Sequence, residues 1–233
     1  MKVYFVGAGP GDPKLITLRG KELIEDADLI VYAGSLVNPK VLSNAKGKKV
    51  DSFGMTLEQT TRLIVDAWKQ GLRVVRLHSG DPTIYSAVRE QILAILPYGI
   101  DYEIVPGVSS VFACAAALGQ QLTSETLVIT RPSGKTLAED QLVELSNLKP
   151  TMAIFLGVDK IDTIMQRVRY APETPTSVVY HASWDDQVII TGTVSDIATK
   201  AREAGITKSA IILIGDELTF EGERRSYLYS PKT

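Results

Sequence analysis

Residues 3–13 read VYFVGAGPGDP, and this stretch decides the fold class. The apolar run at its start predicts a buried strand, which ends in glycines at alternate positions, Gly7, Gly9 and Gly11. An amphipathic helical pattern follows from about Leu15. A strand that breaks into a glycine turn before a helix lets a ligand approach bare backbone. The stretch therefore predicts a small-molecule site in an α/β unit, although a plain strand–turn–helix junction has the same pattern.

The glycine spacing differs from that of a dinucleotide site. It is G-x-G-x-G rather than G-x-G-x-x-G, and Pro10 removes one of the backbone N–H groups that a pyrophosphate needs. A Rossmann site also has an acid about twenty residues beyond its glycines. The strand predicted there, Leu29–Tyr32, runs into Ala33 and Gly34, and Asp28 comes before it. The pattern therefore favours a nucleoside ligand with little or no phosphate.

Composition is that of an ordinary soluble globular protein. The chain has 233 residues, 45% hydrophobic and 22% charged, with a net charge of −2, which argues against a nucleic-acid or anionic-membrane partner. No apolar run approaches the roughly 18 residues of a membrane span, and the start of the chain does not resemble a signal peptide. The single cysteine, Cys114, suits a reducing cytoplasm and reads as a buried structural thiol. With only two histidines besides, the sequence predicts no metal site.

Short β-branched runs alternate with longer amphipathic stretches, which is typical of α/β domains. Strands are predicted at 2–6, 29–32, 49–51, 73–77, 102–105, 126–130, 152–155, 177–181, 188–191 and 210–214. Helices are predicted at 15–25, 57–69, 84–96, 109–118, 138–145, 160–168 and 195–204. The polar segment 119–125 is the predicted boundary between an N-terminal domain, 1–120, and a C-terminal domain, 125–233. Residues 182–187 are predicted to be a hairpin loop, and 226–229 an added edge strand.

Two further polar turns follow predicted strands. Residues 79–82 read SGDP, and residues 106–110 read PGVSS before a helix. Each has an ordinary explanation, since Asp81 could bond its own backbone and the serines could cap a helix. In open α/β sheets, however, ligands bind outside the carboxyl ends of strands. We therefore expect the three turns to face one crevice.

These three turns together resemble the signatures of the tetrapyrrole methylases, the S-adenosylmethionine enzymes of cobalamin and siroheme synthesis. The resemblance runs from Val3 to about Leu218. Residues 32–38 (YAGSLVN), 51–56 (DSFGMT) and 181–184 (HASW) look like the precorrin-4 C11-methyltransferase branch. The uroporphyrinogen-III branch has an Asp after the equivalent of Tyr32, whereas this chain has Ala33, Gly34 and Ser35 there, which argues against that branch.

The resemblance implies two α/β domains of the class III methyltransferase type, a cofactor cleft between them, and a homodimer. It implies methylation of C11 in precorrin-4 or cobalt-precorrin-4, or else catalysis by another precorrin methyltransferase of the family. The residues that it assigns to the S-adenosylmethionine pocket are Pro10, Gly80, Asp81, Ile84, Ser109 and Ser110 in the first domain, with Leu156, Ala182 and Ala210 in the second. Relatives often carry Met at the Leu156 position, which keeps an apolar wall.

A tetrapyrrole substrate carries many carboxylates, so its site needs cations. Arg131 and Lys135 lie on a predicted loop and are candidates for a substrate clamp, unless the loop is simply a solvated charged segment. His181 could border the site, while His78 reads as a near-core histidine; no catalytic base is identified. Two other functions stay open: a nicotinamide-dependent oxidoreductase, disfavoured by the glycine spacing, and a non-catalytic tetrapyrrole carrier.

Overall fold

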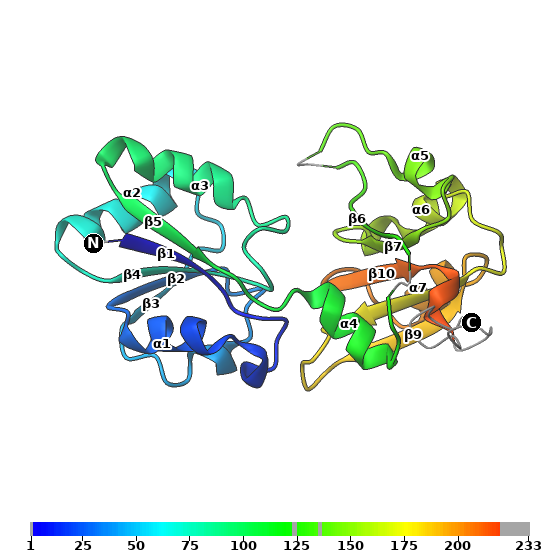
Figure 1. Ribbon diagram of the computed structural model, residues 1–233, viewed down its shortest axis with the longest axis horizontal. Helices are drawn as coiled ribbons and strands as arrows, with labels where there is room; N and C mark the ends of the chain where they lie inside the picture. Colours follow the sequence, from blue (N-terminus) through cyan, green and yellow to red (C-terminus); the bar gives the residue numbers. More distant parts are fainter. Residues whose placement is uncertain (1, 123–124, 135–136, 220–233) are drawn as a thin grey trace, which may run out of the picture. The chain divides into compact units, whose positions relative to one another are not determined.

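The computed structural model describes residues 2–122, 125–134 and 137–219, and the chain folds as two compact units (Figure 1). Unit 1 comprises Met1–Ala113 together with the tripeptide Ser183–Asp185, and unit 2 comprises Cys114–Ala182 and Asp186–Thr233. The chain changes unit inside helix α4 (Ser110–Leu118), a few residues before the boundary expected at 119–125. The residues of the edge strand expected at 226–229 lie outside the described ranges.

Unit 1 is built on a parallel sheet of five strands in the order β3-β2-β4-β1-β5. Its strands are β1 (Lys2–Gly7), β2 (Leu29–Tyr32), β3 (Lys48–Asp51), β4 (Val74–His78) and β5 (Asp101–Val105). Its helices are α1 (Leu18–Asp26), α2 (Leu57–Lys69) and α3 (Val88–Ile95), with 3₁₀ turns at Pro13–Leu15, Pro39–Leu42 and Leu96–Tyr98.

Both faces of this sheet are buried, because side chains alternate along each strand. Val3 and Phe5 of β1 pack into a cluster with Ile64 of α2 and Ile95 of α3. Val6 packs on the opposite face in a cluster that includes α1. In Figure 1, α2 and α3 accordingly lie on one side of the sheet of unit 1 and α1 on the other.

Side-chain caps set the beginnings of α1 and α2 in unit 1. Thr56 and Gln59 form a reciprocal capping box that starts α2 at the predicted residue. The helix predicted from Leu15 begins only at Leu18, because Asp12 first caps a 3₁₀ turn and Thr17 then caps α1. The prediction of a helix from Ile84 was wrong for its first turn. The chain there takes left-handed φ values at Tyr85 and Ala87, and α3 starts after them.

Unit 2 holds a mixed sheet in the order β6-β7-β10-β8-β9, in which only β6 and β7 are parallel to each other. Its strands are β6 (Leu127–Thr130), β7 (Thr151–Ile154), β8 (Pro175–Tyr180), β9 (Val188–Thr193) and β10 (Ala210–Ile214). Its helices are α5 (Leu142–Ser146), α6 (Ile161–Arg167) and α7 (Ile197–Glu203), with 3₁₀ turns at Val158–Lys160 and Asp216–Leu218. Residues of all three helices pack with β7, β8 and β10 in one apolar cluster.

The hairpin predicted around 182–187 is confirmed, since β8 and β9 pair antiparallel from Tyr180–Val188 to Pro175–Thr193. The helix predicted at 138–145 begins only at Leu142, because the Asp140 carboxylate accepts a hydrogen bond from the Leu142 amide and holds the preceding chain in a loop. Within the described ranges, no helix is long and apolar enough to cross a membrane.

Candidate functional site

The first two glycine-containing turns meet through their backbones. β1 and β4 are adjacent and parallel, so their carboxyl ends lie side by side. The Ala8 amide donates to the His78 carbonyl at 2.7 Å. Beyond the strands, Gly9 and Gly80 donate to each other's carbonyls, at 3.2 Å and 2.9 Å. Backbone hydrogen bonds therefore join the turns after β1 and β4 to each other.

The third turn joins them through Asp81 and glycine contacts. The Gly107 amide, after β5, donates to the Asp81 carboxylate at 2.9 Å. A Cβ on Gly7 would lie 2.6 Å from both the Gly107 Cα and the Gly80 carbonyl oxygen. These are distances that real Cβ atoms do not show, so glycine is required for the backbones to approach. The expected meeting of three turns at one sheet edge is present in unit 1.

The reason for the glycines differs from the one expected. The sequence suggested space for a ligand against bare backbone, but the chain itself fills the space beside each glycine. A Cβ on Gly9 would lie 2.9 Å from the Leu15 carbonyl oxygen, and one on Gly11 would lie 2.0 Å from the Trp184 ring. The glycines therefore allow other segments of the same chain to pack closely against this turn.

The amides of the first turn are largely occupied within the protein. Those of Ala8 and Gly9 donate to β4 and its following turn, and that of Asp12 donates to the Ser183 hydroxyl at 3.0 Å. Pro10 has no N–H. A diphosphate needs a row of amides that are free to donate. The turn therefore suits a ligand without phosphate, which counts against a nicotinamide dinucleotide.

The other candidate cofactor residues of unit 1 gather around these turns. Gly80 has a φ of +63°, and a Cβ there would lie 3.6 Å from the Ser110 amide nitrogen. Ser109 is buried, and Ser110 is the first residue of α4. Ile84 is half-buried and donates its amide to the Asp81 carbonyl at 3.3 Å. Unit 1 thus brings its candidates together.

The three candidates in unit 2 lie at one end of its sheet. Ala210 begins β10 and pairs with Tyr180, the last residue of β8, so Ala182 follows two residues later at the same end. β7 ends at Ile154, which pairs with Ile212, and Leu156 follows with a left-handed φ of 53° and an exposed side chain.

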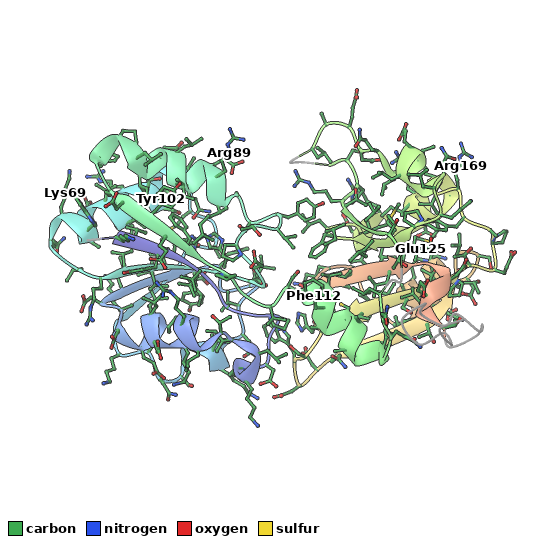
Figure 2. The ribbon with its side chains drawn as sticks, in the orientation of Figure 1. Lys69, Arg89, Tyr102, Phe112, Glu125 and Arg169 are labelled. Atoms are coloured by element: carbon green, nitrogen blue, oxygen red, sulfur yellow. The ribbon has the colours of Figure 1, made fainter. Side chains whose placement is uncertain are left out.

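The two histidines have different surroundings. His78 is buried at the end of β4, with its ring 6.0 Å from that of Phe5, which also meets Tyr102 edge-on. Tyr102 lies on β5, an edge strand of the unit 1 sheet (Figure 2). Burial, aided by the Arg76 charge, lowers the pKa of His78 to about 3, so the ring is neutral at physiological pH. Among the described residues its Nε2 atom has no hydrogen-bond partner. His181 stacks on Tyr180, and its Nδ1 lies 3.0 Å from the Asp186 carboxylate.

The candidate clamp residue Arg131 is half-buried directly after β6, and Lys135 lies outside the described residues. Near Arg131, the Asp140 carboxylate accepts from the Ser133 amide at 2.7 Å and from two nitrogens of Arg167 at 2.9 Å and 2.7 Å. Lys160 also donates to the Ser133 carbonyl, at 2.5 Å. These bonds connect the backbone of Ser133 to Asp140 and Lys160.

Sequence reasoning missed two features. Arg76 of β4 is buried and donates to Gln91 at 2.7 Å and to Ser52 at 3.0 Å, and burial lowers its pKa to about 10. A lone arginine within the apolar run VVRLH was the signal for it. The second is Trp184, whose indole N–H donates to the Pro10 carbonyl at 2.8 Å. No local sequence pattern indicates a contact across that separation.

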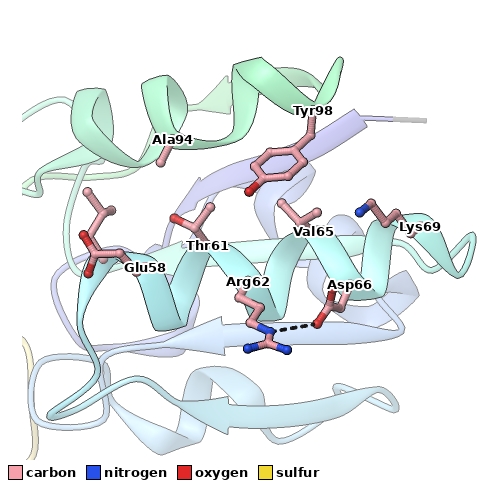
Figure 3. Close-up of a pocket in the computed structure, with 9 residues that line it drawn as sticks. Glu58, Thr61, Arg62, Val65, Asp66, Lys69, Ala94 and Tyr98 are labelled. Carbon is pink, nitrogen blue, oxygen red and sulfur yellow. Dashed lines mark ion pairs between the residues drawn. The ribbon is translucent and has the colours of Figure 1, made fainter.

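A separate groove of about 500 Å³ lies over α2, beside Ala94 of α3 and Tyr98 (Figure 3). Its lining includes the ion pair between Arg62 and Asp66, at 3.8 Å, and Lys69. None of the candidate site residues lines it. The turns at the strand ends remain the stronger candidate.

Comparisons with known proteins agree with one another. The family model of the tetrapyrrole (corrin/porphyrin) methylases matches residues 2–198. The chain is 50% identical to a cobalt-precorrin-4 C(11)-methyltransferase of Methanocaldococcus jannaschii, over 98% of this chain and 92% of that protein. It is 42% identical to a precorrin-4 C(11)-methyltransferase of Pseudomonas aeruginosa, over 98% and 95% of the two chains.

Solved structures show the same similarity. That of a cobalt precorrin-4 methyltransferase has a TM-score of 0.90 and 39% identity, covering 94% of this chain and 96% of the other. A uroporphyrin-III C-methyltransferase of Thermus thermophilus, in complex with S-adenosylhomocysteine, has a TM-score of 0.82 and 28% identity, covering 94% and 99%.

Proposed function

The chain belongs to the tetrapyrrole (corrin/porphyrin) methylases, and on this premise we propose that it methylates ring carbon C11 of precorrin-4 or cobalt-precorrin-4, with S-adenosylmethionine as donor. The observation that carries the proposal in this structure is the single backbone assembly formed by the turns after β1, β4 and β5. The amides of Ala8, Gly9, Asp12, Gly80 and Gly107 donate to acceptors of the chain itself, which suits a nucleoside ligand without phosphate.

In this proposal the cofactor contacts the residues named for it in the sequence. Pro10, Gly80, Asp81, Ile84, Ser109 and Ser110 do so from unit 1, and Leu156, Ala182 and Ala210 from unit 2. The sulfonium cofactor supplies an already activated methyl group. Asp81 does not act as a base in this scheme, because its carboxylate is engaged by the Thr83 amide at 2.8 Å and by Gly107.

The protein's contribution is then orientation. Holding two reactants in the correct geometry can lower a barrier by about 7–11 kcal/mol. Rigid turns suit this role, and backbone hydrogen bonds hold the turns of unit 1. On the substrate side, Arg131 and Lys135 would pair with carboxylates of the tetrapyrrole, with His181 close by.

We also propose that the protein acts as a homodimer in the cytoplasm. The family resemblance supports the dimer, and the lone buried thiol of Cys114 suits a reducing compartment. Light scattering coupled to gel filtration tests the dimer: a mass of about one chain, 25.4 kDa, would rule it out.

The activity is tested with purified protein, precorrin-4 or cobalt-precorrin-4, and S-adenosylmethionine labelled at its methyl carbon. We expect one labelled methyl in the product, with NMR placing it at C11. Label at another carbon would assign a different precorrin methyltransferase. Binding of S-adenosylhomocysteine without transfer to either substrate would favour a carrier, and preferential binding of NAD in calorimetry would favour an oxidoreductase.

A further inference from the structure

The tripeptide Ser183–Asp185, which we call the docked tripeptide, belongs to unit 1 although it comes 70 residues after the rest of that unit ends. Each of its residues has a partner there. The Ser183 hydroxyl accepts from the Asp12 amide at 3.0 Å, and the Trp184 indole donates to the Pro10 carbonyl at 2.8 Å. Asp185 pairs with Lys40. The first two contacts bracket the turn that follows β1.

Trp184 also covers Gly11, which lies between the two bonded residues. A Cβ on Gly11 would lie 2.0 Å from the indole Cδ1 and 2.2 Å from Nε1. Gly11 is buried, and its φ lies outside the left-handed region, so its own backbone could accept an alanine. Glycine at this position is therefore required by the Trp184 ring.

The backbone of the docked tripeptide is itself held in an unfavourable conformation. Ser183 has a φ of 70°, and His181, two residues earlier, has a φ of 44°. Such conformations in residues other than glycine persist where surrounding contacts enforce them, and they gather at functional sites. Here the contacts that enforce the conformation include the two hydrogen bonds of Ser183 and Trp184 to the turn.

We propose that Trp184 is a positioning residue for the methyl-donor site. It acts through the Pro10 carbonyl and the Gly11 backbone, which its indole fixes in a single arrangement. When a ligand binds a turn that is already ordered, no binding free energy is lost to ordering that turn. This inference rests on the proposed function, because it takes the turn after β1 as part of the S-adenosylmethionine site. Loss of Trp184 therefore weakens cofactor affinity much more than it slows methyl transfer at saturating cofactor.

The first experiment is a double-mutant cycle on affinity for S-adenosylhomocysteine, measured by calorimetry. Trp184→Ala raises the Kd about tenfold, which is the size expected when one hydrogen bond and the order that it imposes on the turn are both lost. Gly11→Ala alone gives a similar loss, because its methyl group displaces the indole. In the Trp184→Ala background, Gly11→Ala changes the Kd less than about twofold. Equal losses in both backgrounds would show that Gly11 does not act through Trp184 and would overturn the inference.

Trp184→Phe separates the two contacts, since it keeps a ring over Gly11 and removes the N–H donor. It folds more readily than the alanine variant, and its Kd lies between those of the wild type and Trp184→Ala. The matched control is Trp68→Phe, which alters the other tryptophan, on α2. Its Kd stays at the wild-type value. At saturating S-adenosylmethionine, kcat of the Trp184 variants stays within about threefold of the wild type; a fall in kcat with unchanged Kd would also overturn the proposal.

A spectroscopic readout uses the same control protein. In Trp68→Phe, Trp184 is the sole tryptophan, so its emission reports on the docked indole directly. Because the indole is fixed on the turn before ligand binds, its emission in the free protein should lie at shorter wavelength than in the unfolded protein, and its anisotropy should not rise when saturating S-adenosylhomocysteine is added. An anisotropy that rises on saturation would show that the ligand orders the indole and would contradict the inference. If the wild-type protein itself binds no S-adenosylhomocysteine, the proposed function fails instead, so the two failures are distinguishable.

Discussion

Among the described acidic residues of unit 2 that form ion pairs, we expect Asp140 to contribute most to the free energy of unfolding. Its side chain is 1% exposed, and its carboxylate accepts hydrogen bonds from the Ser133 and Leu142 amides as well as from both terminal nitrogens of Arg167. Asp140→Ala removes all of these acceptors at once. The backbone donors on the loop after β6 and at the start of α5 are then left without partners.

The magnitude follows from these contacts. Breaking a buried ion pair by removing one partner costs about 3–5 kcal/mol, and each buried donor left unsatisfied costs about 1–3 kcal/mol. The Arg167 side chain is 36% exposed, so water can hydrate its guanidinium and the cost falls to the low end. We expect the free energy of unfolding to drop by about 3 kcal/mol.

Urea unfolding followed by circular dichroism measures this loss, and hydrogen exchange of α6 and β7 assigns it to unit 2. Asp162→Ala is the matched control, because Asp162 pairs with Arg202 in the same unit but both side chains are more than half exposed, at 51% and 55%. An exposed pair contributes about 0–1 kcal/mol. Equal destabilisation by the two variants would refute the reasoning from burial.

The same pair predicts a pH dependence. Hydrogen bonds from Arg167, above all, lower the pKa of Asp140 below its ordinary value. A depressed carboxyl pKa stabilises the folded state above the unfolded pKa of about 3.9, and this contribution is lost as the pH falls toward the folded pKa. The stability difference between wild type and Asp140→Ala should therefore be constant from pH 7 to about pH 5 and shrink below about pH 4. A difference that grows on acidification would have the wrong sign.

Three further outcomes are expected. Gly107→Ala places a Cβ 2.2 Å from the Gly80 carbonyl oxygen, so it should cost about 1–3 kcal/mol in thermal unfolding and abolish binding of S-adenosylhomocysteine; wild-type affinity would contradict the close contact. Arg131→Ala should raise the KM for the tetrapyrrole far more than the Kd for the cofactor, and an unchanged KM removes Arg131 from the substrate site. Cys114 is buried and its pKa is raised to about 12, so iodoacetamide at pH 8 should label it only after denaturation; rapid labelling of the native protein would show the thiol to be accessible.

The regular elements were predictable where their signals are local. Leu29–Tyr32, Leu57–Lys69 and Ala210–Ile214 have the predicted bounds. The two strands are short β-branched or apolar runs, and α2 has its capping box within its own first turn. The meeting of three turns also followed from a general rule, because carboxyl ends of neighbouring parallel strands share one edge.

Predictions failed where a side chain bonds to a distant residue. Asp81 holds the Gly107 amide, 26 residues later, and the chain after Asp81 delays α3. Asp140 is bound by Arg167, 27 residues later, and its loop delays α5. In both cases the helical pattern was present but an acid stabilised the loop before it. Trp184 and Pro10 are 174 residues apart, so no local stretch of sequence could predict the hydrogen bond between them.

The glycines after β1 make contacts other than those that the sequence suggested. Gly7 gives room to the backbones of Gly80 and Gly107, Gly9 to that of Leu15, and Gly11 to the Trp184 ring. A side chain at any of them would displace protein atoms before it met a ligand. In the proposed site, the preference for a nucleoside over a dinucleotide arises from the amides of Ala8, Gly9 and Asp12, which donate to carbonyls of the chain and to the Ser183 hydroxyl. It follows that changing the glycine spacing alone would not create a dinucleotide site here, because these three N–H groups would still be engaged.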